Sequence, residues 1–294
     1  MKNKILSMLG MLLLACSSYG QEVDSTEMLM EEIESSLVFR TGVIELPEGN
    51  ATITVPKGFQ FLERDQSIFL LTEVWGNQPD SSILGMLVPE GGIYTGWLFT
   101  VSYDPMGYVK DDDAEDIDYD ELLKEQQEEM RDGNAERIQL GYEPIEFIGW
   151  AARPYYDKEK KVLHWAKELK FGEDSVNTLN YNLRILGRKG VFVINAISVI
   201  DELPEVNLHV KDVLSSVTFN TGNTYFDFDS DVDEVAAWTV GGLVAGKVLA
   251  KVGFFALFIK FWKIIGLALI AAGGAVWKFI TGKRNGDKNP YTKE

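Results

Sequence analysis

The spacing of apolar positions in the first part of the chain predicts one helix followed by strands. Residues 24–38 repeat apolar side chains about every four positions, which is typical of an amphipathic helix. Residues 43–46 and 51–55 alternate apolar and polar side chains around a Pro-Glu-Gly-Asn cluster, which predicts a β-hairpin. Three further apolar runs are strand candidates: residues 67–74, 84–88 and 97–102.

The second part of the chain predicts a helix, a run of strands and another helix. Asp118 followed by Glu121 is a capping-box pattern, so we expect a helix from Tyr119 to about Arg131, ended by Asp132-Gly-Asn134. After it, Pro204 begins a segment with an apolar side chain every three or four positions up to Val217, which predicts a helix. The strands expected between these helices are residues 145–151, 163–171, 178–186 and 190–200.

The last three of these strands are joined by short turns, at residues 172–175 and 187–190. Such short connections favour an antiparallel meander, because parallel neighbours need long crossovers. We therefore predict an α+β fold in which a largely antiparallel sheet is packed with helices. In this division, residues 21–225 form one acidic α+β domain.

The N-terminus has the layout of a secretory signal peptide over residues 1–20. Lys2 and Lys4 precede an apolar run of residues 5–15, which is too short to span a bilayer. Cleavage after Gly20 is one outcome. The alternative is lipidation of Cys16, because Leu-Leu-Ala-Cys resembles a lipobox. Cys16 is also the single cysteine, so no disulfide can form within the chain.

The C-terminal region predicts a membrane anchor. Residues 236–280 contain no acidic residue, and residues 264–280 with the preceding Phe-Trp reach the length of a transmembrane helix. The basic tail of residues 281–294 then places the C-terminus in the cytoplasm by the positive-inside rule. Residues 238–259 are apolar but contain two lysines, so they predict either a second span or an interfacial helix. We expect an inner-membrane protein with an exported N-terminal domain.

Charge narrows the classes of partner. Residues 21–235 carry 17 basic and 43 acidic side chains, a net charge of −26. A domain of that charge repels phosphate backbones, so nucleic-acid binding is not expected. Residues 226–235 hold alternating aspartates at 227, 229, 231 and 233, which predict either an acidic juxtamembrane linker or a cation site.

No phosphate-binding glycine loop, nucleophile elbow or paired-histidine zinc motif occurs in the sequence. We therefore expect no cofactor, no metal and no catalytic constellation. Aromatic and polar residues that dominate binding hot spots are instead concentrated in three segments. The candidate partner-binding residues are Trp75, Asn77, Trp150, Tyr156, Asp157, Trp165, Asn180, Tyr181, Arg184 and Arg188.

These same segments resemble a family of predicted membrane-anchored bacterial proteins, domain-of-unknown-function family 2167. The resemblance implies an exported domain with a C-terminal anchor, and it implies no activity. More distantly, the strand order resembles Mog1/PsbP-like sandwiches. The matching pieces are Trp75-Gly-Asn77, Gly85-Met-Leu87 with Pro89, Gly107-Tyr-Val109 with residues 111–114, Gly149-Trp150, Pro154, Tyr156-Asp157, Leu163-His-Trp-Ala166, Leu179-Asn-Tyr181, Arg184, Leu186-Gly-Arg188 and Asp227-Phe228.

Three hypotheses about function follow. The first is a non-enzymatic envelope protein whose outer domain binds another envelope protein. The second is a hydrolase that uses acidic residues near Asp157 or at residues 111–113. The third is a small-ligand-binding or cation-binding module that uses surface carboxylates, above all those at residues 227–233.

Overall fold

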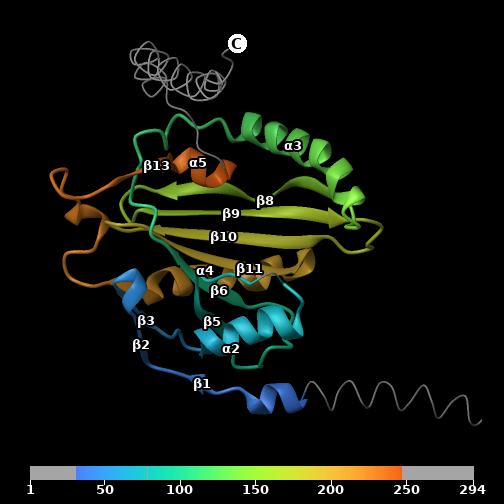
Figure 1. Cartoon of the computed structure of the whole chain (residues 1–294), viewed down its shortest axis with the longest axis horizontal. Helices are drawn as coiled ribbons and strands as arrows, with labels where there is room; N and C mark the ends of the chain where they lie inside the picture. The colour runs from blue at the N-terminus through green and yellow to red at the C-terminus, as the bar shows by residue number, and fades with distance from the viewer. Residues whose placement is uncertain (1–30, 78, 247–294) are drawn as a thin grey trace, which may run out of the picture. The chain divides into compact units, whose positions relative to one another are not determined.

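The computed structural model describes residues 31–77 and 79–246 of the chain. An eight-stranded antiparallel sheet organises this part, in the order β1-β4-β5-β6-β11-β10-β9-β8 (Figure 1). The predicted α+β class with a largely antiparallel sheet is therefore confirmed. The strands of the main sheet are β1 (Phe39–Arg40), β4 (Phe59–Glu63), β5 (Ile83–Pro89), β6 (Phe99–Asp104), β8 (Ile145–Asp157), β9 (Val162–Phe171), β10 (Thr178–Leu186) and β11 (Val191–Val199).

The predicted meander is present as β9, β10 and β11. In it, Arg184 lies opposite Leu163 on one side and Val193 on the other. Its turns are short and hold Gly172 and the pair Gly187 and Gly190. Gly190 is required by packing, because a Cβ there would lie 2.2 Å from the carbonyl oxygen of Asp104. The close approach at Gly190 lets β11 pair directly with β6, beginning with Val191 opposite Asp104.

One face of the sheet, which we call the closed face, is covered by a helix and a small second sheet. The cover consists of α4 (Leu203–Ser216) and the three-stranded sheet of β12 (Val217–Phe219), β3 (Ala51–Thr54) and β2 (Val43–Leu46). α4 contributes the buried apolar positions expected from its spacing, at Val206, Val210 and Val213. The predicted 43–55 hairpin is confirmed as β2 and β3, joined by a 3-10 turn at Pro47–Gly49.

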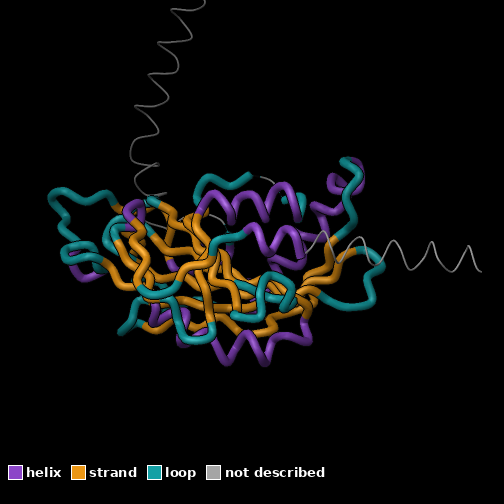
Figure 2. The backbone as a smooth tube through the Cα atoms, turned by 90° about the horizontal axis from the view of Figure 1, so that it is seen from below, coloured by secondary structure: helices purple, strands orange, loops and turns teal. Residues whose placement is uncertain are grey.

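In the described part of the chain, helices cover the other face of the sheet at its two ends, and we call it the open face. Helical residues 31–36, α2 (Arg64–Phe69) and the π-helical turn η2 (Leu70–Val74) pack over β4 and β5. α3 (Tyr119–Gln139) and α5 (Val240–Ala245) lie at the β8 and β9 end. Figure 1 shows β10 and β11 between these two groups of helices, and Figure 2 shows helices on both sides of the strand layer.

Three element predictions need correction. The strand expected at residues 67–74 is helical, as part of α2 and η2, with Ser67 and Leu70 buried and Leu71 and Val74 packed against the same core at helical spacing. The helix from Tyr119 does not end at residues 132–134 but continues to Gln139. The strand expected at 145–151 continues to Asp157 as β8. The N-cap was predicted correctly: the Asp118 carboxylate accepts hydrogen bonds from the backbone N–H groups of Asp120 and Glu121.

The described chain ends in β13 (Val235–Thr239) and α5, with β13 parallel to β7 (Tyr108–Lys110). Residues 225–233 are folded against the domain rather than extended, since Arg188 pairs with Asp233 at 2.7 Å. Within residues 31–77 and 79–246, no helix is long and apolar enough to cross a membrane. The predicted signal peptide, the transmembrane segment at 264–280 and the basic tail lie outside the described residues.

Candidate functional site

Arg184 is the centre of a hydrogen-bonded cluster on the open face. Its guanidinium lies over the ring of Trp165, with Cζ 5.0 Å from the ring centroid. Nη1 donates to the Asn195 side-chain oxygen at 3.0 Å, and Nη2 donates to the Asn182 side-chain oxygen at 3.3 Å. Nη1 also donates to the backbone oxygen of Leu183. Residues from β9, β10 and β11 therefore fix the position of one partly exposed guanidinium.

Lys167 lies on the same face of β9, two positions from Trp165. Its ammonium donates to the Gln126 side-chain oxygen at 2.6 Å, and Gln126 in turn donates to the backbone oxygen of Val244 in α5. Burial, followed by the nearby charge of Arg184, lowers the pKa of Lys167 to about 8. We call Lys167, Asn182, Arg184 and Asn195, together with Trp165 beneath them, the Arg184 cluster.

Neither cation of the Arg184 cluster has an ion pair within the described ranges. There, no carboxylate oxygen comes within 4.0 Å of Lys167 or Arg184. Burial lowers the pKa of Arg184 to about 10, opposed by Asp104. Burial raises the pKa of Asp104, and the positive charge of Arg184 opposes that rise, although the two groups form no ion pair. Partly buried charges without a counter-ion are unfavourable, so this arrangement costs stability.

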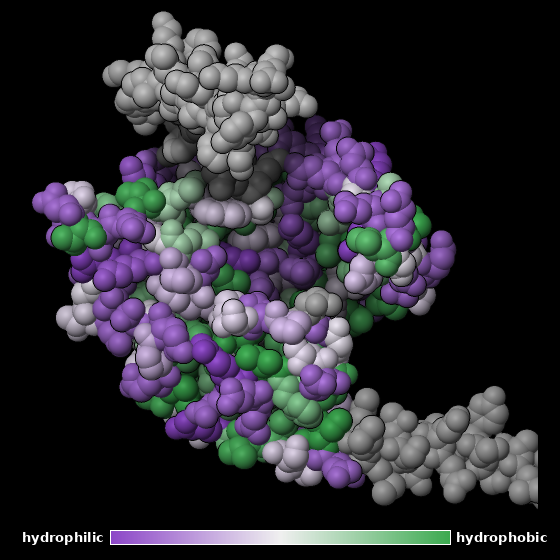
Figure 3. Space-filling model, in the orientation of Figure 1, coloured by the Kyte–Doolittle hydropathy of each residue, from purple (hydrophilic) through white to green (hydrophobic). Residues whose placement is uncertain are grey.

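Trp75 and Asn77 line a pocket of about 310 Å³ on the same open face. The pocket is also lined by Asn195 and Ile197 of β11, and Asn195 accepts the hydrogen bond from Arg184. Ile197 is 60% exposed and Trp75 is 39% exposed, although β11 is a central strand. The pocket and the Arg184 cluster therefore form one surface, and Figure 3 shows a hollow with a hydrophilic floor on this face.

Several predicted binding residues instead hold structural elements together. The Trp150 indole donates to the backbone oxygen of Tyr119 at 3.1 Å, which ties the start of α3 to β8. The Asp157 carboxylate accepts backbone N–H groups of Glu159 and Lys160 in the turn after β8. Arg188 pairs with Asp233 and donates to the backbone oxygen of Gly222.

Tyr156 belongs to a second cluster around the Asp111 carboxylate. Asp111 accepts hydrogen bonds from Lys161 at 2.7 Å and from Tyr156 and Tyr225 at 2.9 Å each. Burial alone would raise the pKa of Asp111, but these hydrogen bonds outweigh it and lower the pKa. Burial and the hydrogen bond to Asp111 raise the pKa of Tyr156. We call Asp111, Tyr156, Lys161 and Tyr225 the Asp111 cluster.

Tyr181 lies on the closed face, away from Arg184. It is buried, and its hydroxyl lies 3.3 Å from His164 Nδ1. Burial raises the pKa of Tyr181 to about 12 and lowers the pKa of His164. Both side chains line a largely apolar pocket of about 560 Å³ between α4 and the β9–β10 strands. Asn180, by contrast, lies on the open face and accepts a hydrogen bond from Asn182 at 2.7 Å.

The carboxylates proposed for hydrolysis and for cation binding are used within the fold. A hydrolytic acid needs a raised pKa, whereas hydrogen bonds lower the pKa of Asp111 and Asp157. The Asp227 carboxylate accepts hydrogen bonds from the backbone N–H and the hydroxyl of Thr224, and Asp233 pairs with Arg188. Among residues 31–77 and 79–246, no three His, Cys, Asp or Glu side chains are grouped to hold a metal ion.

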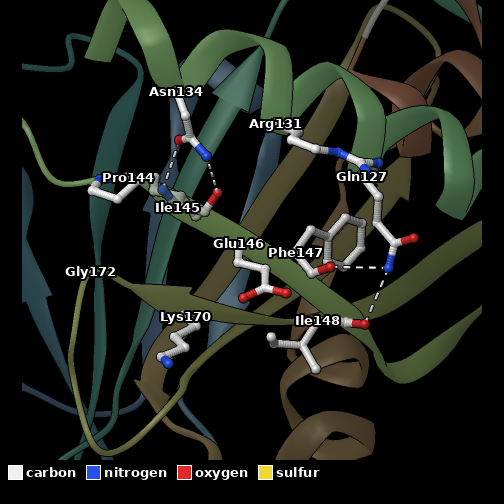
Figure 4. A pocket seen from close by; sticks show the side chains of 10 residues that line it. All are labelled: Gln127, Arg131, Asn134, Pro144, Ile145, Glu146, Phe147, Ile148, Lys170 and Gly172. Carbon is white, nitrogen blue, oxygen red and sulfur yellow. Dashed lines mark hydrogen bonds between the residues drawn. The ribbon is translucent and has the colours of Figure 1, made fainter. Parts of the chain in front are cut away.

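A further hollow, of about 520 Å³, lies between α3 and the start of β8 (Figure 4). Its amide side chains are occupied by the backbone. Asn134 exchanges two hydrogen bonds with Ile145, and Gln127 donates to the carbonyls of Phe147 and Ile148. These bonds attach α3 to the edge strand β8, so the polar side chains of this hollow serve the packing of two elements.

The structure brings together Trp75, Asn77, Trp165, Asn180 and Arg184 of the predicted residues. The sequence prediction omitted the other polar members of this surface, which are Lys167, Asn182 and Asn195. One signal was available: Asn180, Asn182 and Arg184 alternate along β10, and alternate strand residues share a face.

The fold defines an α+β protein built on one large antiparallel sheet, and on the open face of that sheet Lys167 and Arg184 have no ion pair with any described residue. The chain belongs to the family described as protein of unknown function (DUF2167), whose model matches residues 38–274. The predicted family is therefore confirmed. A search of curated proteins gave no match.

Two solved structures have a similar arrangement of elements. Cyanobacterial PsbP (CyanoP) from Synechocystis sp. PCC 6803 shares 9% identity with a TM-score of 0.36, over 60% of this chain and 91% of that one. The Ran-binding protein Mog1p of Saccharomyces cerevisiae shares 12% identity with a TM-score of 0.31, over 62% and 96% of the two chains. At these values the likeness carries no argument about function.

Proposed function

We propose that this protein is a non-enzymatic binding module of the cell envelope, which holds another envelope protein on the open face of its sheet. In this proposal the domain is exported, and the apolar C-terminal segment anchors it in the inner membrane. The observation that carries the proposal is the exposed Ile197 on a central strand, which lines one pocket with Trp75 and with Asn195, the acceptor of a hydrogen bond from Arg184.

The side chains of this surface are those that binding sites use. Trp and Arg dominate the energetics of protein interfaces because they combine a large apolar area with hydrogen-bond donors. An exposed isoleucine in the middle of a sheet is unfavourable in water, and a partner that covers it recovers its burial energy. The hydrogen-bonded Asn182, Arg184 and Asn195 keep the polar part of the surface in place before a partner arrives.

Site-specific photocrosslinking in cells tests the proposal. A photoreactive phenylalanine analogue replaces Trp75 or Ile197 in the full-length protein, one site at a time. Leu208 provides the control, since it is 71% exposed and lies on α4, over the closed face. We expect the same envelope protein crosslinked from positions 75 and 197 and not from 208. Equal crosslinking from 208, or none from 75 and 197, would contradict the proposal.

A further inference from the structure

Arg184 is held so that one edge of its guanidinium faces no acceptor. Within the described part of the chain, Nη1 donates to Leu183 and Asn195, and Nη2 donates once, to Asn182. Nε–H and the second N–H of Nη2 have no acceptor among those residues. Two adjacent N–H groups of a guanidinium match the two oxygens of a carboxylate, which is the common bidentate pairing of arginine.

We infer that the Arg184 cluster is a binding site for a single carboxylate group, which Arg184 holds by its free edge and Lys167 neutralises from the side. The inference rests on the proposed function, because it names the chemistry that the open face recognises. The Lys167 ammonium donates to Gln126 alone among the described residues, so it has donors left for an anion. A bound carboxylate would supply the counter-ion that neither cation has among residues 31–77 and 79–246.

The surroundings define the rest of the ligand. The domain is strongly acidic, so a ligand with many negative charges is repelled and one with a single negative charge is favoured. Beside the cluster, Trp75 and Ile197 present exposed apolar area, connected to Arg184 through Asn195. The ligand is therefore a carboxylate attached to an apolar or aromatic group, such as the free C-terminus of a partner chain that ends in an apolar residue.

The titratable groups that face the two cations are consistent with this site. Asp104 opposes Arg184 from β6, and Glu129 raises the pKa of Lys167 from α3, against the larger effect of burial. Asp104 forms no ion pair with Arg184 among the described residues. A bound carboxylate adds a closer negative charge, so it raises the pKa of Lys167 from about 8 towards the ordinary lysine value.

The experiment titrates the full-length protein, in detergent micelles, with named probes. These are 3-phenylpropanoate, a tetrapeptide ending in phenylalanine with a free carboxylate, the same peptide amidated, and inorganic phosphate. NMR of ¹³C-methylated lysines follows the pKa of Lys167, and calorimetry follows binding. We expect the two carboxylates to bind saturably and to raise the pKa of Lys167 by about one unit, a tenfold change in its proton affinity. The amidated peptide and phosphate should not do so.

Three variants decide whether the site is the one described. Asn195→Asp is nearly isosteric and places a carboxylate against Nη1 of Arg184, so the fold persists while the positive charge that attracts the ligand is neutralised. Arg184→Met removes the bidentate edge. Both should weaken binding at least tenfold. Arg153→Met is the matched control, because it removes an exposed cation that pairs with Asp120 elsewhere on the domain; its affinity should equal that of the wild type.

The outcomes separate this inference from the proposed function. Tighter binding of the tetrapeptide than of 3-phenylpropanoate identifies a chain terminus as the source, and equal binding identifies a small carboxylic acid; both support the site. Unchanged affinity in Asn195→Asp and Arg184→Met, no saturation by either carboxylate, or preference for phosphate overturns it. Partner crosslinking from position 197 that persists in Arg184→Met leaves the binding module standing and removes the carboxylate site alone.

Discussion

The Asp111 cluster and the Arg184 cluster each hold a cation among polar and aromatic side chains, but only the Asp111 cluster contains a carboxylate. Around Asp111, one lysine and two tyrosines donate to one carboxylate, so every charge has an opposite partner. Around Arg184, amide oxygens and an indole ring hold the cation, and no carboxylate pairs with it in the described structure. The first arrangement stabilises the fold, whereas the second leaves positive charge uncompensated, and an anionic ligand can neutralise that charge.

The largest effect should follow from breaking the Asp111 cluster. Asp111→Ala leaves Lys161 without a counter-ion and two tyrosine hydroxyls without an acceptor, so we expect a loss of about 3 kcal/mol in the free energy of unfolding. Chemical denaturation of the full-length protein measures it. Because the pKa of Asp111 is lowered in the fold, its contribution is present above the unfolded value of 3.8 and is lost as the pH falls through the folded value. An unchanged acid transition in the variant would show that the cluster is incidental.

Adding a carboxylate to the Arg184 cluster should raise the free energy of unfolding. Asn195→Asp gives Arg184 an ion pair in place of a neutral hydrogen bond, so we expect a gain of about 1 kcal/mol at neutral pH. Leu208→Asp, on the exposed side of α4, controls for the added negative charge. A larger loss of stability in Asn195→Asp than in the control would contradict the claim that Arg184 lacks a counter-ion.

The smallest expected effect is the contribution of Lys167 to the pH dependence of stability. Its folded pKa of about 8 lies below the ordinary lysine value of 10.5, so the unfolded chain binds more protons between these values. The contribution of Lys167 to stability therefore rises as the pH increases from about 8 to 10.5. The wild type should gain up to about 1 kcal/mol relative to Lys167→Met over that window, allowing for the partial exposure of the ammonium. Parallel curves for the two proteins would count against a desolvated Lys167.

The sequence was sufficient to predict the meander, because short glycine-containing turns allow only antiparallel neighbours there. It was insufficient at residues 67–74, where an apolar run fits a buried strand and a short helix equally well. At the site, Arg184 and Trp75 could be selected by residue type. Lys167 and Asn195 could not, since they reach Arg184 only through the pairing register of β9 and β11 with β10.

The join between α5 and the Arg184 cluster has a mechanical consequence. The side chains of Val240 and Val244 are buried, and the backbone oxygen of Val244 holds Gln126, which holds Lys167. A pull on the chain beyond residue 246 acts on α5 before it reaches β13 and the Arg188–Asp233 pair. Tension would therefore disturb the hydrogen bonds that connect Val244, Gln126 and Lys167 before it disturbs the Arg188–Asp233 pair. A load on the tail would in this way change the affinity of the proposed carboxylate site.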